Sequence, residues 1–218
     1  MKLIPLFLLV GMLVVSGWAE DAKPRPYSLQ LVKRAEAFLD KAAVKWWTML
    51  AEQGYADAQC NLGMCYYLGR GVTKDYEEAV KWYAKSSEQG YALAQCHLGW
   101  CYLVGEGVTQ DYKEAVKWWT KSAKQGHPNA QFKLGSCYAN GRGVTKDEEE
   151  AVKWYRKSAE QGNAYAQLFL GYCYITGEGV TKDDREAVKW WKKSAMQGNE
   201  DAKKELQFFM KLHNLPSI

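Results

Sequence analysis

Histidine and cysteine are the residue types in this sequence with the greatest capacity for chemistry, and their spacing is the first guide to function. The histidines are His97, His127 and His213. His97 lies beside Cys96, but no Cys-x-x-Cys or His-x-x-x-His spacing places two metal ligands close together. We therefore interpret the histidines as surface residues and predict neither a metal site nor a bound cofactor.

Motifs for phosphate binding and for nucleophilic catalysis are also missing from the sequence. The turn Gly105-Glu106-Gly107 has neither the preceding strand nor the Lys-Ser/Thr ending of a phosphate-binding loop. Ser-x-x-Lys and Lys-Thr-Gly, which carry the catalytic groups of penicillin-binding enzymes and class A β-lactamases, do not occur. The residues therefore favour a binding protein, without catalytic residues, over an enzyme.

The elements that would position a binding site follow from an internal repeat, which is the first feature to seek in any sequence. A glycine recurs every 36 residues without insertion, at Gly54, Gly90, Gly126, Gly162 and Gly198. The repeat predicts a linker and the start of a cap helix at 20–35, capping half-repeats at 36–53 and 198–218, and complete units at 54–89, 90–125, 126–161 and 162–197.

Each unit is expected to contain two helices. In the first unit, Leu62 and Tyr66 belong to an apolar pattern with helical spacing, which predicts a helix over about residues 56–68. Gly69 can end this helix in the left-handed conformation, and the second helix is expected to run to Gln89. Because one helix pair cannot cover its own apolar face, the units must stack on one another.

The second helices carry recognisable start signals. In the first unit, the cap is expected to be Thr73 or Asp75, because both side chains accept hydrogen bonds from the first helical N–H groups. Two later units contain patterns that resemble capping boxes, Thr145-x-x-Glu148 and Thr181-x-x-Asp184.

The repeated residues resemble those of a known family. Leu62-Gly63-x-x-Tyr66 followed by Ala79-x-x-x-Tyr83 is similar to the tetratricopeptide signature, although Gln59 stands where that motif has Trp. The longer pattern resembles the Sel-one-like repeat family, a tetratricopeptide-like subfamily, over about residues 43–205. This resemblance implies an all-α fold, a right-handed α/α superhelical solenoid of antiparallel helix pairs that serves as an adaptor in protein complexes.

The N-terminal segment has the layout of a secretory signal peptide. A short positive start, Met1-Lys2, precedes an apolar stretch over 3–15, and Gly17 and Ala19 place small residues before a cut after Ala19. The alternative is an uncleaved anchor, but the apolar stretch is shorter than the roughly 20 residues that usually span a bilayer. We expect residues 1–19 to be removed and the exported chain, periplasmic or extracellular, not to span a membrane.

The charge balance argues against nucleic acid as a partner. The net charge is +4, and it falls to +3 without residues 1–19, which contain one lysine. No basic face dominates, whereas nucleic-acid-binding domains concentrate Lys and Arg on one surface. A repeated Glu-x-x-Lys-x-x-x-Lys pattern in the second helices could form a stripe for an acidic partner, but we favour the interpretation of a solvated outer face with weak i,i+3 ion pairs.

The six cysteines occupy two repeat positions, at Cys60 and Cys96, and at Cys65, Cys101, Cys137 and Cys173. The later equivalents of Cys60 are Phe132 and Leu168, so this position accepts apolar packing. Only offset pairs such as Cys65–Cys96 or Cys60–Cys101 are compatible with the spacing of packed helices. We therefore expect mostly free, buried thiols.

Comparison of the units with one another separates packing positions from surface positions. Residues equivalent to 57, 61, 64 and 68 differ in every unit, and their spacing places them on one helical stripe. Because the first helices of tetratricopeptide-like solenoids line the concave groove, the resemblance places this stripe where ligands bind. The predicted partner-binding residues are Leu93, His97, Trp100, Tyr165, Phe169 and Tyr172.

Two hypotheses follow for the function. The first is an exported, monomeric scaffold or adaptor that binds a protein or peptide, such as an envelope component, through this groove. The second comes from the cysteine-rich secreted branch of the same family, which includes members described as β-lactamases, and predicts a β-lactamase-like or cell-wall-related hydrolase. That branch pairs one cysteine on each helix of a unit, whereas the second helices here contain none.

Overall fold

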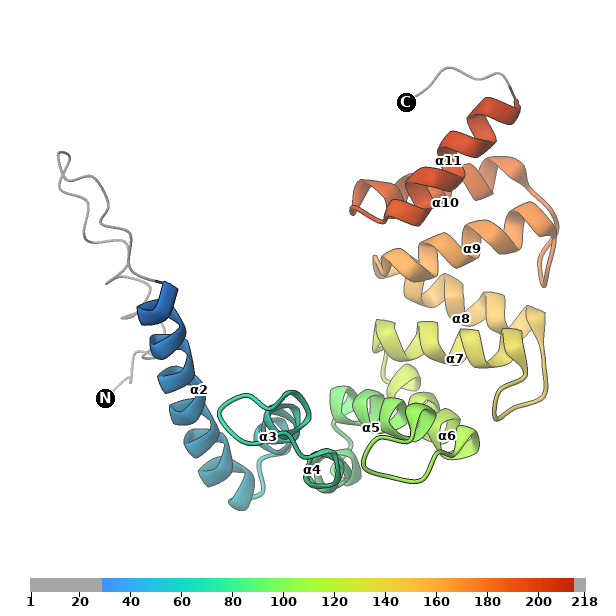
Figure 1. Ribbon diagram of the computed structural model, residues 1–218. Helices are drawn as coiled ribbons and strands as arrows, with labels where there is room; N and C mark the ends of the chain where they lie inside the picture. Colours follow the sequence, from blue (N-terminus) through green and yellow to red (C-terminus); the bar gives the residue numbers. More distant parts are fainter. Residues whose placement is uncertain (1–28, 214–218) are drawn as a thin grey trace, which may run out of the picture. The chain divides into compact units, whose positions relative to one another are not determined.

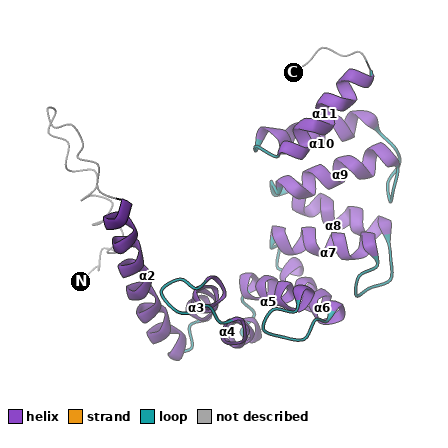
Figure 2. Ribbon diagram, viewed as in Figure 1, coloured by secondary structure: helices purple, strands orange, loops and turns teal. Residues whose placement is uncertain are grey.

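In a computed structural model, the structure describes the backbone of residues 29–213 and the side chains of residues 37–213, and this part is all-helical (Figures 1 and 2). The predicted signal peptide lies outside the described residues. The chain divides into two units, residues 1–39 and 40–218, and the helix pairs belong to the second. The helices are α2 Leu29–Glu52, α3 Ala56–Leu68, α4 Tyr76–Glu88, α5 Ala92–Val104, α6 Tyr112–Lys124, α7 Pro128–Asn140, α8 Glu148–Glu160, α9 Ala164–Thr176, α10 Asp184–Met196 and α11 Glu200–Leu212.

The helices alternate between two roles that repeat every 36 residues. The first helices of the pairs are α3, α5, α7 and α9, and the second helices are α4, α6, α8 and α10. Every helix from α3 to α11 has 13 residues, so each repeat has the same dimensions. The predicted all-α solenoid of helix pairs is confirmed. No helix within residues 29–213 combines the length and apolar character that a membrane span requires.

The two helices of a pair touch where a glycine of the first meets an aromatic ring of the second. A Cβ added to Gly99 would lie 2.7 Å from Cδ1 of Trp119, and one added to Gly63 would lie 2.8 Å from Cδ1 of Tyr83. Both rings are almost completely buried. The repeated Leu-Gly motif therefore exists because only glycine leaves room for this ring.

Hydrogen bonds between buried side chains and main-chain groups link the helices. Ser86 Oγ on α4 donates to the Ala56 carbonyl at the start of α3, at 2.6 Å. Gln95 Nε2 donates to the Ser87 carbonyl of the preceding pair, and Gln95 Oε1 accepts from Gln125 Nε2 at 2.8 Å. All three kinds of contact recur in every pair, so each repeat satisfies polar groups at the helix end of the repeat before it.

The loop within each pair packs against the preceding repeat. Gly107 has a φ of +73°, and a Cβ there would lie 2.1 Å from the Tyr76 carbonyl oxygen, so both its conformation and its surroundings require glycine. Val108 in the same loop packs against the buried core, as do the valines at the equivalent positions. This docking leaves no space for inserted residues, which accounts for the invariant period.

The predicted capping boxes are wrong. Asp147 and Asp183, rather than Thr145 and Thr181, cap their helices, and the Asp147 carboxylate accepts from the Glu150 N–H at 2.9 Å. The helices begin two residues later than the box pattern requires, because a main-chain bond from the Asp147 N–H to the Tyr138 carbonyl holds the loop extended up to that residue. In the first unit the cap is likewise Asp75.

Candidate functional site

The residues that vary from repeat to repeat lie along the first helices, and we call this surface the variable stripe. It comprises the four positions of each first helix that are equivalent to residues 57, 61, 64 and 68. None of these side chains is buried, whereas the repeated residues between them, such as Ala58 and Leu62, are buried. The stripe is therefore a surface whose composition the packing of the repeat does not dictate.

On α5, the stripe residue Trp100 is held by a tyrosine of the preceding first helix. Trp100 Nε1 donates to the Tyr67 hydroxyl at 3.0 Å, and this hydroxyl donates to Glu106 Oε2 at 2.5 Å. Burial and the hydrogen bond to Glu106 raise the pKa of Tyr67 to about 12, so the hydroxyl stays protonated and can donate. The indole is thus held in one orientation, and a side chain that is already ordered loses little entropy in any contact that it makes.

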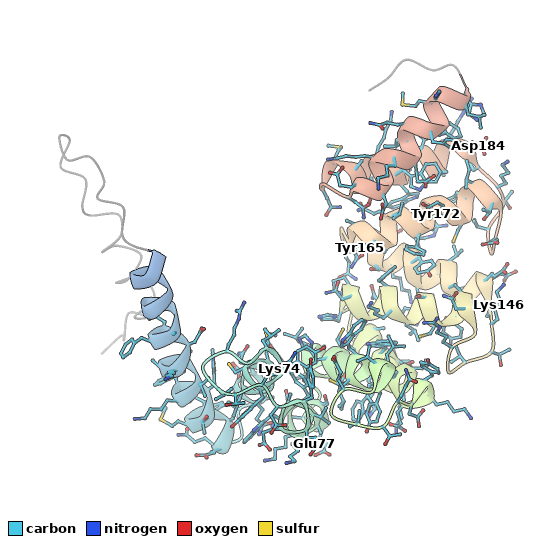
Figure 3. The ribbon with its side chains drawn as sticks, viewed as in Figure 1. Lys74, Glu77, Lys146, Tyr165, Tyr172 and Asp184 are labelled. Atoms are coloured by element: carbon cyan, nitrogen blue, oxygen red, sulfur yellow. The ribbon has the colours of Figure 1, made fainter. Side chains whose placement is uncertain are left out.

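On α9, Tyr165 and Phe169 are the exposed aromatic residues of the stripe. Their exposed fractions are 59% and 38%, although both are aromatic. Phe132 of α7 contacts both rings, with ring centroids 6.1 Å from Tyr165 and 5.5 Å from Phe169. Figure 3 shows Tyr165 near the N-terminal end of α9, at the opposite end of the pairs from Lys146 and Asp184 in the loop region.

Tyr172 continues this aromatic group toward α11. Its ring contacts the rings of Phe169 and Trp191 edge-on, at centroid distances of 6.0 and 5.6 Å. Its hydroxyl donates to Glu205 Oε1 at 2.8 Å, and burial together with this carboxylate raises the pKa of Tyr172 to about 12. Tyr172 is therefore partly a packing residue that positions the exposed rings.

Lys133 joins the α5 and α9 parts of the stripe. Its ammonium Nζ lies 4.5 Å from the centroid of the Trp100 ring and 5.7 Å from that of Phe132. Because Phe132 in turn contacts Tyr165 and Phe169, one continuous series of contacts runs from α5 to α9. The structure thus brings four predicted anchors, Trp100, Tyr165, Phe169 and Tyr172, into a single array.

Leu93 and His97 lie deeper than these residues. Leu93 is half-buried and packs against the core cluster that contains Tyr83. The interpretation of the histidines as surface residues is wrong for His97, which stacks on Tyr83 and whose Nε2 is buried. The ring of the preceding second helix lies beneath this stripe position and draws the imidazole inward. His127 instead caps α7, where its Nδ1 accepts from the Ala130 N–H at 3.3 Å.

Several residues of the array were missed by sequence reasoning. Phe132 occupies the repeat position of Cys60, which was interpreted as internal packing, and Tyr67, Glu106 and Glu205 showed no pattern related to function. The sequence feature that could have revealed the array is Phe132 itself, because the other three repeats have no aromatic residue at this position. The partners of Tyr67 and Tyr172 come from other repeats, so no spacing within one helix could have revealed them.

The repeated lysines of the second helices are engaged in local contacts. Lys81 pairs with Glu78 at 2.9 Å, and Lys85 lies 4.0 Å from the centroid of the Trp82 ring. The other three second helices repeat both contacts. These contacts favour the interpretation of a solvated outer face over that of a stripe for an acidic partner.

All six cysteines are free thiols, which confirms the prediction made from their spacing. Burial raises the pKa of Cys96 and Cys137 to about 11, and the pKa of each other thiol is also raised. At neutral pH the thiols are therefore protonated and unreactive. Within residues 37–213, no group of three or more His, Cys, Asp or Glu side chains could hold a metal ion.

Comparison with known proteins agrees with this architecture. The family model for the Sel1 repeat matches five consecutive segments, at residues 40–55, 56–91, 92–127, 128–163 and 164–199. No curated protein sequence matches the chain.

Among solved structures, c5321, a protective antigen present in uropathogenic Escherichia coli strains and displaying an SLR fold, is 42% identical with a TM-score of 0.75. The match covers 79% of this chain but only 37% of the antigen, so this chain spans little more than a third of that relative. A Sel1 repeat protein from Oxalobacter formigenes is 41% identical with a TM-score of 0.75, over 82% of this chain and 71% of its own.

An immunity protein from Pseudomonas aeruginosa, Pa5087, is more distant, at 26% identity and a TM-score of 0.52 over 73% of this chain and 59% of its own. Sequence and structure therefore agree, and the chain belongs to the Sel1-repeat family, whose members are typically scaffolds for protein interactions.

Proposed function

We propose that this protein is an exported scaffold that binds a protein or peptide through the variable stripe of its first helices. The observation that carries the proposal is the exposure of Tyr165 and Phe169 on α9, at 59% and 38%. Large rings buried in the centre of an interface contribute most of the binding energy in many complexes. Two exposed rings supported by Phe132 have the arrangement of such an anchor.

Packing within the repeat does not require these rings. The residues equivalent to Tyr165 in two other repeats are Asp57 and Asn129, and a residue equivalent to Phe169 is Asn61. The same backbone therefore accommodates small polar side chains at both places. An aromatic residue that is dispensable for folding and exposed to water supports a role in recognition.

Export is the second part of the proposal. Its support is the pattern of residues 1–19, which have the charged start, the apolar stretch and the small residues of a cleavable signal peptide. The description of the similar Escherichia coli chain as a protective antigen agrees with an exported protein, although that chain is much longer. An envelope component is accordingly the partner that we expect, and we expect the scaffold to be monomeric.

The test is affinity capture from envelope and culture-fluid fractions on immobilised mature protein. The decisive variant is Tyr165→Asn with Phe169→Asn, because other repeats already carry asparagine at these positions, at Asn129 and Asn61. The matched control is Tyr112→Asn, since Tyr112 is a 40% exposed aromatic residue on the second helix α6 and lies outside the stripe. Circular dichroism and urea unfolding establish that both variants are folded.

We expect a specific protein or peptide to be retained by the native and Tyr112→Asn proteins and lost by the double variant. Retention of the same partner by the folded double variant would exclude the α9 rings as anchors. If none of the proteins retains a partner, the scaffold proposal fails, and turnover of a β-lactam substrate would then test the hydrolase hypothesis.

A further inference from the structure

Lys133 is a half-buried cation without an anionic partner in the described part of the chain. It lies on α7 between Trp100 of α5 and Phe132, with its Nζ above both rings. It takes part in none of the ion pairs formed within residues 37–213. A cation over a ring is attracted by the negative face of the ring, but this contact leaves its positive charge uncompensated.

The helix that carries Lys133 supplies no counter-ion. The residues three and four positions away along α7 are Asn129, Ala130, Ser136 and Cys137, and none is acidic. The lysines of the second helices differ in this respect, because Lys81 and its equivalents each have a glutamate three residues earlier.

The neighbouring groups from other helices do not neutralise Lys133 either. Glu106 and Glu205, which lie beside the two ends of the array, each accept a hydrogen bond from a tyrosine hydroxyl, and neither forms an ion pair with Lys133 within residues 37–213. Cys96 and Cys137 interact electrostatically with Lys133, but burial raises the pKa of each thiol to about 11, so both are neutral at pH 7. Burial also lowers the pKa of Lys133, as expected for a cation removed from water without a counter-ion.

The position of Lys133 specifies where an anion would sit in a bound partner. Aromatic stripe residues lie on both sides of it, Trp100 on α5 and Phe169 on α9. A ligand that used both sides would continue past the lysine in both directions. The anion therefore belongs in the interior of a bound segment and not at its end, which fits an acidic side chain better than a terminal carboxylate.

We propose that the variable stripe binds a peptide segment in which an Asp or Glu side chain pairs with Lys133 while an adjacent apolar or aromatic side chain packs against Phe169. This inference rests on the proposed scaffold function and adds the chemistry of the partner. The attraction between a carboxylate and a nearby ammonium is stronger at a partly desolvated site than at a fully exposed one, because less water screens the two charges.

The experiment selects ligands from a phage-displayed library of random peptides on the purified protein. Parallel selections use Lys133→Asn, which reproduces Asn61 at the same repeat position, and Lys133→Glu, which reverses the charge. Lys81→Asn is the matched control, because it removes a lysine from a second helix outside the stripe. A synthetic peptide of the selected consensus is then measured by fluorescence anisotropy, with its acidic residue intact or replaced by the amide.

We expect peptides selected on the native and Lys81→Asn proteins to share one acidic residue beside an apolar or aromatic one. The amide peptide is expected to bind the native protein roughly tenfold more weakly. The two peptides should bind Lys133→Asn equally, and selection on Lys133→Glu should favour Lys or Arg instead. An acidic preference that persists in Lys133→Asn would overturn the pairing.

The outcomes separate this inference from the proposed function. One outcome is that the selected peptides bind the native protein but not the Tyr165→Asn, Phe169→Asn variant, and still show no preference for an acidic residue. That result would uphold the scaffold function and refute the role of Lys133. If no peptide is enriched on the native protein, peptide binding by the stripe is refuted. The same holds if the enriched peptides bind the double variant as well as they bind the native protein, and this inference is then refuted too.

A measurement without any ligand tests the premise. The pKa of the Lys133 ammonium, followed by the NMR shift of its Cε, should lie below the value of an exposed lysine and should rise when the consensus peptide binds. A free-state pKa at or above that of an exposed, unpaired lysine would show that the protein already supplies a counter-ion, and would refute the inference.

Discussion

The imidazole of His97 stacks on the phenol ring of Tyr83, with ring centroids 5.1 Å apart and ring planes inclined by 17°. His97 belongs to α5 and Tyr83 to the preceding second helix, α4, so the contact joins two repeats. His97 Nε2 is buried and has no hydrogen-bond partner among residues 37–213. Burial, aided by nearby His127, lowers the pKa of His97 to about 4.

This contact predicts that acid weakens the fold between pH 6.5 and 4. The unfolded chain binds a proton at His97 with a pKa near 6.5, whereas the folded protein does not bind it until the pH falls to about 4. His97 therefore does not change the free energy of unfolding above pH 7. It lowers this free energy as the pH falls from 6.5 to about 4. The loss is about 3 kcal/mol at most.

The measurement is the urea unfolding free energy at pH 7.5 and 4.5, for the native protein and for His97→Phe. Phenylalanine is compatible with this place, because Phe169 occupies the same position two repeats later and contacts Tyr155 at 5.8 Å. Carboxylates titrate in both proteins, so the difference between their pH slopes reports the histidine. Equal slopes would contradict the prediction.

Gly99→Ala is expected to destabilise the protein by about 1–3 kcal/mol, the usual cost of overpacking a core. Helix propensity alone would favour alanine by roughly 1 kcal/mol. The added Cβ, however, would lie 2.7 Å from Trp119, whose Nε1 donates to the Cys96 carbonyl and resists displacement. Thermal and urea unfolding measure the change.

The control for this substitution is Gln207→Ala. Gln207 is exposed on α11 at the same repeat position as Gly99, so alanine there should leave stability within about 0.5 kcal/mol. A Gly99→Ala protein as stable as the native one would show that the ring and glycine are less tightly apposed than the structure indicates.

The cysteines should behave as six free but protected thiols. We expect slow reaction with iodoacetamide at pH 8 in the native protein, because burial raises each thiol pKa, and complete reaction after denaturation. Mass spectrometry of the protein alkylated without reductant counts the free thiols. A disulfide between Cys65 and Cys96, or between Cys60 and Cys101, would contradict the structure.

Export predicts a mature chain that begins at Glu20. Intact-mass analysis of protein from the periplasm or culture fluid should show the loss of residues 1–19. Ala19→Arg should abolish cleavage, because the signal peptidase site requires a small residue there. Full-length protein in the cytoplasmic fraction as the major native form would refute this part of the proposed function.

The repeat made the fold predictable to the level of individual helices. The expected first helix over residues 56–68 coincides with α3, and Gly69 ends it with a φ of +70° as anticipated. Such agreement is possible because each repeat contacts only its neighbours, so one unit of sequence contains nearly all the information needed to place a helix pair.

Prediction failed where a contact came from another part of the chain. Thr145 matched a local capping pattern, but the bond from the Asp147 N–H to the Tyr138 carbonyl placed the cap two residues later. His97 was interpreted as a surface residue because its own helix gives no sign of Tyr83, which lies fourteen residues earlier on a different helix.

The sequence by itself determined the number and period of the repeats, the extent of the first helix over residues 56–68 and the stripe on which the repeats differ, since periodicity and glycine conformation are local properties. Only the tertiary structure decided which stripe residues are free to bind. Trp100 and Tyr172 are hydrogen-bonded to Tyr67 and Glu205, whereas Tyr165 and Phe169 stay exposed. Lys133 has no counter-ion in the described part of the chain. Exposure and charge compensation depend on side chains that meet across repeats, and no pattern along one helix contains them.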